Sequence, residues 1–225
     1  MGFPRRLSMR SAGAVGLGLL VAGCFEMKQD FKFKSDGTAD VTVRIALDAA
    51  VVALANKDNS AEWCSKGIAE NGGATVKFEA KTEGADSVCL ISVSGSMNDV
   101  VAALAKSDSG GSANQAISLV REGDLYQFTI ELPPLGEPEA PEDNSPLAKS
   151  MQAMMLAKMS GRVLAWSVTA PQIIETTGAL SGDGTIANYS RPLAEAFTSK
   201  EPTEFITKFS LEEPGLSGWM KSLFD

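Results

Sequence analysis

The chain has 225 residues, with 20 lysines and arginines against 28 aspartates and glutamates, and no histidine. This length can bury a proper core in one large domain or two small ones, and 44% hydrophobic residues indicate a globular protein. The acidic balance argues against nucleic-acid binding, which requires basic side chains to neutralise phosphates. The absence of histidine excludes Ser-His-Asp and Cys-His catalysis and histidine-ligated zinc.

The N-terminus has the pattern of an export signal. Three arginines within the first ten residues precede a small apolar run over 11–20, and Leu20-Val21-Ala22-Gly23-Cys24 follows. This order is typical of a secretory signal, and the apolar run is shorter than the about 20 residues that span a bilayer. A cysteine after small residues resembles the bacterial lipobox. The sequence therefore predicts a cleaved signal peptide over 1–23 and a lipid anchor at Cys24. The alternatives are a plain secretory signal and a short transmembrane anchor.

The anchor determines how the mature protein meets a membrane. Each buried CH₂ of an acyl chain contributes about 0.8 kcal/mol, so two or more chains hold a protein stably. Cleavage removes three arginines and no acids, which leaves 17 basic and 28 acidic side chains, a net charge of −11. An anionic membrane surface repels such a domain. We expect a lipid-anchored protein of the bacterial cell envelope, and Phe25 in place of an aspartate favours the outer membrane of a Gram-negative host.

Two cysteines, Cys64 and Cys89, remain once Cys24 is acylated. An even number in an oxidising compartment predicts one disulfide, which would stabilise the fold by about 3 kcal/mol. The alternatives are two buried thiols or a redox pair, and the chain has no C-x-x-C motif to favour the latter.

The hydrophobic pattern predicts hairpins interrupted by helices. Alternating apolar residues on both sides of Asp36-Gly37 predict a hairpin that begins within a few residues of Cys24. The later segments predicted are helices over 48–57 and 61–70, strands over 76–78 and 88–93, a capped helix over 96–104, a hairpin over 117–132, strands over 163–168 and 186–189, a helix over 193–197 and a strand over 205–209. This order predicts an α+β fold with a mostly antiparallel sheet.

The segment 133–146 holds five prolines and four acids, and it predicts a stiff, solvated linker. Few strands are expected beyond it, so we predict a single domain over 24–225. The acids of the linker lack the converging pattern of a calcium loop, and no metal or cofactor is expected.

One block resembles a known family. The segment 166–178 (Trp-Ser-Val-Thr-Ala-Pro-Gln-Ile-Ile-Glu-Thr-Thr-Gly) continues into Leu180-Ser181-x-Asp183-Gly184. Together with Cys24 and the Asp36-Gly37 hairpin, it is similar to bacterial lipoproteins of the LppM-like type. The resemblance implies a curved, mostly antiparallel sheet with helices packed in its concave face, and a role in binding lipids or envelope components. The C-terminal transmembrane helix of some relatives has no counterpart here, and the resemblance assigns no functional residue.

Two apolar stripes are candidate binding surfaces. The first lies on a predicted Met-rich helix over 147–160, whose stripe comprises Leu147, Met151, Met154, Met155 and Met159. Methionine is frequent at adaptable binding surfaces, but such a stripe also fits a helix that covers the core. The second stripe is a tail that either lies in the membrane interface or packs on the domain; it comprises Leu216, Trp219, Met220, Leu223 and Phe224.

These patterns predict a non-enzymatic binding or scaffold module for a lipid or another envelope component. One alternative is a histidine-independent hydrolase that uses a Ser-Lys pair or two carboxylates. The adjacent pairs Ser65-Lys66 and Ser199-Lys200 point apart on a helix or a strand, so neither forms a dyad by itself. Another alternative is a structural subunit of an envelope complex, which would expose a large apolar patch.

Overall fold

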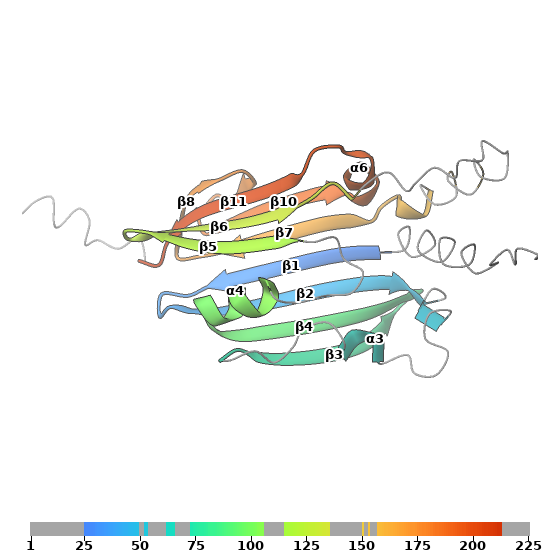
Figure 1. Cartoon of the computed structure of the whole chain (residues 1–225), viewed down its shortest axis with the longest axis horizontal. Helices are drawn as coiled ribbons and strands as arrows, with labels where there is room; N and C mark the ends of the chain where they lie inside the picture. Colours follow the sequence, from blue (N-terminus) through green and yellow to red (C-terminus); the bar gives the residue numbers. More distant parts are fainter. Residues whose placement is uncertain are drawn as a thin grey trace, which may run out of the picture.

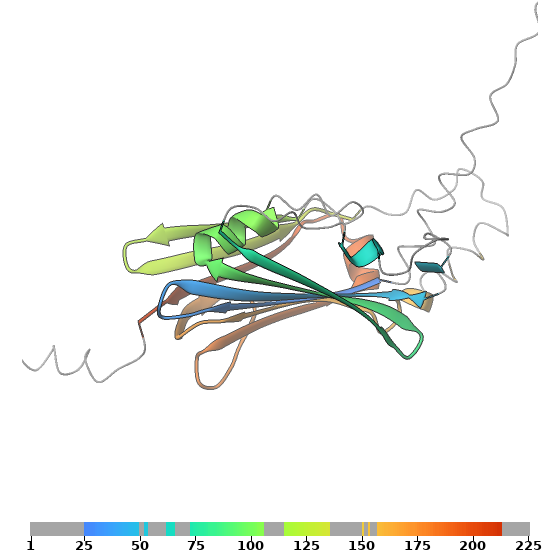
Figure 2. The same ribbon diagram turned by 90° about the horizontal axis from the view of Figure 1, so that it is seen from below.

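The computed structural model describes residues 25–49, 52–53, 62–65, 73–105, 115–135, 150, 153 and 157–212. These residues form two β-sheets that pack face to face, with short helices at their margins (Figures 1 and 2). None of the helices in these ranges is long and apolar enough to cross a bilayer.

The larger sheet has seven strands in the order β3-β4-β2-β1-β7-β10-β9. Their bounds are β1 (Phe25–Phe33), β2 (Thr38–Asp48), β3 (Thr75–Glu83), β4 (Asp86–Ser96), β7 (Val163–Thr169), β9 (Ala179–Leu180) and β10 (Ile186–Pro192). Neighbouring strands are antiparallel except β1 and β7, which run parallel. This one pair joins an N-terminal group of four strands to a C-terminal group of three.

The smaller sheet has four antiparallel strands in the order β5-β6-β11-β8. Their bounds are β5 (Ala116–Glu122), β6 (Leu125–Leu132), β8 (Gln172–Thr176) and β11 (Thr203–Ser210). The chain leaves β7 of the larger sheet and enters β8 of the smaller one through Ala170 and Pro171. Proline suits this corner because it has no N–H to donate to a strand ladder.

Alternation along β1 defines the buried face. Residues 27, 29, 31 and 33 are buried, while the lysines and the aspartate between them are exposed. The inward side chains meet aromatic residues of the smaller sheet, so the core lies between the sheets. The Phe33 ring stacks on Phe209 with centroids 4.7 Å apart and meets Phe128 edge-on at 5.3 Å.

Two helices lie along the part of the larger sheet that the smaller sheet leaves uncovered. Helix α4 (Met97–Ala105) contacts β2, β4 and β5, and it buries Val100 and Leu104. Ser96 caps it, because the Asp99 N–H donates to the Ser96 hydroxyl oxygen at 3.2 Å. Helix α3 (Glu62–Ser65) contacts β3 near the opposite end of the sheet. Figure 1 shows both helices against the β2–β4–β3 region.

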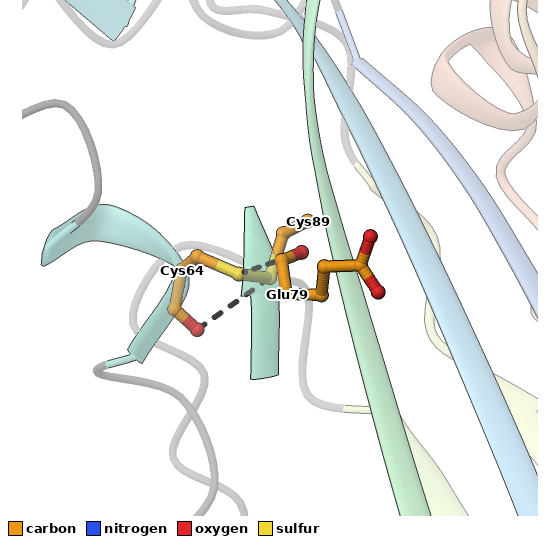
Figure 3. Close-up of a disulfide and its surroundings, with 3 residues drawn as sticks. All are labelled: Cys64, Glu79 and Cys89. Atoms are coloured by element: carbon orange, nitrogen blue, oxygen red, sulfur yellow. Dashed lines mark hydrogen bonds between the residues drawn. A yellow bond between two sulfur atoms is a disulfide. The ribbon is translucent and has the colours of Figure 1, made fainter. Parts of the chain in front are cut away.

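The predicted disulfide is confirmed. Cys64 of α3 and Cys89 of β4 are bonded, and both side chains are buried (Figure 3). The Cys64 Sγ also lies 3.6 Å from the carbonyl oxygen of Glu79 on β3. The bond therefore holds α3 over β3 and β4. β4 lies next to the edge strand of the sheet rather than at its centre.

The broad α+β class and the Asp36-Gly37 hairpin are confirmed. The prediction of a single sheet was wrong, because alternation shows that a strand has one buried face but not what covers it. Here a second sheet packs against part of that face, and helices α3 and α4 pack near β2, β4 and β3. β8 was not among the predicted strands, and it pairs with β11. The predicted helix at 48–57 starts later, because β2 continues to Asp48.

Reduction of the disulfide should destabilise the fold. The bond closes a loop between residues 25 positions apart, so Cys64→Ala with Cys89→Ala should lose about 3 kcal/mol of unfolding free energy. Urea unfolding followed by circular dichroism measures this loss. Dithiothreitol should lower the midpoint of the parent protein and leave that of the double variant unchanged. An equal response of the two proteins would contradict a structural role for the bond.

Gly178 is a second sensitive point, because it lies between the two sheets. A Cβ there would come within 2.4 Å of the Asn188 carbonyl oxygen on β10 and 2.8 Å of the Phe205 ring on β11. Gly178→Ala should therefore cost about 1–3 kcal/mol. Gly182→Ala is the matched control, since its Cβ would meet no atom within 4 Å. Similar unfolding midpoints for the two variants would show that the sheets do not approach each other there.

Candidate functional site

The structure describes few of the residues that the sequence singled out. Cys24, Leu147, Met151, Met154 and Met155 lie outside the described residues, as do all five residues of the apolar tail. Met159 is described, and it is 1% exposed within the core cluster. At this position the methionine stripe is part of the core.

Met159 belongs to a short segment, residues 157–162, that we name the strap. It is fixed to the larger sheet by two ion pairs. The Arg162 guanidinium donates two hydrogen bonds to the Asp86 carboxylate, both at 2.6 Å, and Lys158 lies 3.3 Å from Asp48. The Arg162 carbonyl oxygen also accepts a hydrogen bond from the Leu193 N–H at 2.9 Å. The strap thus holds Met159 in the core.

The strap marks one end of the two-sheet stack. β1 begins at the same end, which we name the anchor end because Phe25 follows the predicted anchor residue, Cys24, in the sequence. The turn between β3 and β4 lies at this end, because Phe25 pairs with Leu47 and Leu47 pairs with Ser87. Helix α6 (Leu193–Thr198) lies there too, because it follows Pro192, which pairs with Val163 at the start of β7. In Figure 1 the strap and α6 lie to the right, with the start of β1.

The opposite end carries a shallow hollow of about 260 Å³ between the β1–β2 turn, the start of α4 and the β5–β6 hairpin. Its lining includes Met97, Leu119 and Tyr126. Its one cation, Arg121, is already engaged: the guanidinium lies 5.7 Å from the Tyr126 ring centroid and donates to the Gly123 carbonyl oxygen. This arrangement offers no converging reactive groups.

A polar group crosses the interior between the two sheets. Gln29 of β1 is 6% exposed, and its amide forms a reciprocal pair with the amide of Gln115, which precedes β5. The Gln29 Nε2 donates to Gln115 Oε1 at 3.1 Å, and the Gln115 Nε2 donates back at 3.0 Å. The oxygen and the NH₂ group of the Gln29 amide are therefore both hydrogen-bonded to Gln115, the residue that leads into β5 of the smaller sheet.

Trp166 of β7 is the strand neighbour of Gln29 and faces the same interior. It is 1% exposed, and its ring lies 5.4 Å from Tyr189, which in turn lies 5.8 Å from Phe205 of the smaller sheet. Among the described residues, its Nε1–H has no hydrogen-bond partner. A buried donor left unpaired costs about 1–3 kcal/mol, which makes Trp166 an unusual feature of this core.

The outer face of the larger sheet carries charges that pair with one another. Arg44 of β2 donates to Glu26 of β1 at 3.0 Å and to Glu83 of β3 at 2.6 Å. Lys81 lies 2.8 Å from Glu83. Hydrogen bonds from Lys81 and then Arg44 lower the pKa of the Glu83 carboxyl to about 2. Such exposed pairs suit a solvated surface, and the described residues contain no cluster of three potential metal ligands.

The fold belongs to the α+β class. It is mostly β, with two sheets and short helices at the sheet margins. Among solved structures, the chain is similar to the NMR structure of the folded domain of LppM from Mycobacterium tuberculosis. The TM-score is 0.51, and the match covers 85% of this chain and 92% of that domain. Sequence identity is 11%, so the likeness is one of fold alone. No family model matches the chain, and no curated protein matches its sequence.

This comparison confirms the LppM-like architecture that the block at 166–184 predicted. It does not extend to the lipobox or to a ligand. Sequence reasoning placed Trp166 in that block only as a fold element. The signal that could have marked it is a tryptophan in an alternating strand, since its N–H needs a partner when the ring is buried.

The pKa of Glu83 gives a test of the outer-face pairs. A carboxyl whose pKa is lowered in the folded state stabilises that state above its unfolded pKa of 4.5, and this stabilisation is lost as the pH falls toward 2. Glu83→Gln should therefore be less stable than the parent at pH 7, and the two should converge near pH 2. Urea unfolding at a series of pH values measures this. Glu122→Gln, on β5, is the control and should parallel the parent throughout.

Proposed function

We propose that the protein is a lipid-anchored binding module of the bacterial cell envelope, attached through Cys24, and that it is not an enzyme. The observation that carries this proposal is the position of β1. The strand starts at Phe25, directly after the cysteine of the lipobox-like segment. A chain acylated at Cys24 has no tether, so the anchor end of the two-sheet stack rests at the membrane surface.

The binding role is supported by the kind of surfaces the domain offers. The charged groups of the outer face pair with one another, and the interior between the sheets is apolar apart from a few amides and hydroxyls. A ligand with apolar character, such as a lipid, suits this interior better than a polar metabolite does. The LppM-like fold is consistent with a lipoprotein of the envelope.

A structural subunit of an envelope complex is the second candidate. Ile174 on β8 and Leu180 on β9 are 49% and 48% exposed, and these strands are the edges of the two sheets on one side of the stack. An exposed sheet edge with apolar side chains is a surface on which another chain can add a strand. Copurification of a stoichiometric protein partner that Ile174→Lys abolishes would favour this second role.

The anchor is tested by Cys24→Ala in the native host. The parent protein should sediment with membranes and incorporate labelled palmitate, because acyl chains hold it there. The variant should lose the label and appear in the soluble exported fraction. Cys64→Ala with Cys89→Ala is the control, and it should keep both label and membrane association. Palmitate label that persists in Cys24→Ala would contradict the proposed anchor.

A further inference from the structure

The interior around Trp166 contains one hydrogen-bond donor in excess. The Gln29 amide lies on the neighbouring strand and pairs with Gln115, and it does not accept this N–H. A tryptophan N–H usually finds a partner when the ring is buried. Within the described part of the chain Trp166 Nε1 has none, so an acceptor that is not part of these residues would gain a full hydrogen bond there.

The surroundings of this donor restrict the chemistry of such an acceptor. Along β7, Trp166 lies between Leu164 and Val168, which are 1% and 0% exposed. The buried polar side chains among the described residues are amides and hydroxyls, with no lysine or arginine. A carboxylate brought here would lose its hydration without gaining a counter-charge, which is very costly. A neutral acceptor on an otherwise apolar molecule suits these surroundings.

A route to this position leads from the anchor end. Leu164 and Trp166 are the first two inward residues of β7, and β7 follows the strap directly. Met159 of the strap is a buried member of the same core cluster. An unbranched thioether side chain adapts its shape more readily than a branched or aromatic one. Displacement of Met159 would open the core on the side that faces the lipid anchor.

We propose that the Trp166 indole N–H donates a hydrogen bond to the carbonyl oxygen of a neutral acyl ester bound between the two sheets. The proposal rests on the proposed binding function and names its ligand class: an ester of a fatty acid rather than the free acid or a plain hydrocarbon. Gln29 keeps its pair with Gln115 and helps to leave this donor available.

The test uses three ligands that differ only in the acceptor: methyl dodecanoate, dodecanoate and tridecane, each delivered from cyclodextrin. The full chain is purified with Cys24→Ser, so that no covalent acyl chain competes. Calorimetry at pH 8 should show the ester binding about tenfold more tightly than the alkane, as one hydrogen bond in an apolar site predicts. Dodecanoate should bind more weakly than the ester, because it is ionised at this pH.

Trp166→Phe removes the N–H and keeps an aromatic ring. This variant should bind ester and alkane alike, whereas Trp63→Phe, a change to a partly buried indole on α3, should keep the tenfold preference. If Trp166→Phe does not fold, the proposal can still be tested on the parent protein by NMR of its indole N–H. The Trp166 indole N–H resonance should move downfield with methyl dodecanoate and not with tridecane.

The outcomes separate the two proposals. Equal binding of ester and alkane by the parent protein, or a preference that persists in Trp166→Phe, would overturn the role of Trp166 while leaving an apolar binding function in place. Binding of none of the three ligands by the folded parent would overturn both. Membrane attachment through Cys24 is unaffected by either result, because it is tested separately.

Discussion

The contact between the two sheets is the interaction on which the rest of the structure depends. Phe33 of β1 stacks on Phe209 and meets Phe128, so one strand of the larger sheet is joined to two strands of the smaller one. Burying one large side chain contributes about 1.5–3 kcal/mol, and close aromatic pairs add about 0.5–1.5 kcal/mol. Helix α4 then packs against β2, β4 and β5, and the disulfide holds α3 over β3 and β4.

Local pattern was enough to predict most of the strands and the disulfide, but it missed β8 and β9 and did not predict how the strands form two sheets. The alternation around Asp36-Gly37 predicts a hairpin because turn and strand signals are both short-range. The parallel pairing of β1 with β7 has no such signal, since it joins residues far apart in the chain. The same limit applies to Trp166. Its sequence neighbours predict burial, but whether its N–H finds a partner depends on residues that the fold brings together from distant parts of the chain.

The two proposals concern different parts of the molecule. The anchor is a property of Cys24 and of the strand that follows it at once, while the ligand site is a property of the packed interior. They meet at the anchor end, where the strap closes the core near the start of β1 and the proposed anchor. The Arg162–Asp86 pair is bidentate and partly buried, the geometry in which such pairs hold a segment firmly.

The parallel pair β1–β7 also bears on how the protein is made. In the proposed export the chain is delivered from its N-terminus, so β1 to β4 can pair with one another before residues 163–169 arrive. During that interval β1 has no partner on its β7 side, and its inward face carries Phe31 and Phe33. The two exposed lysines and the aspartate on its other face are the kind of charges that discourage edge-to-edge aggregation. Pairing of β1 with β7 ends this stage. This step is expected to be slow, because the two strands are far apart in the chain.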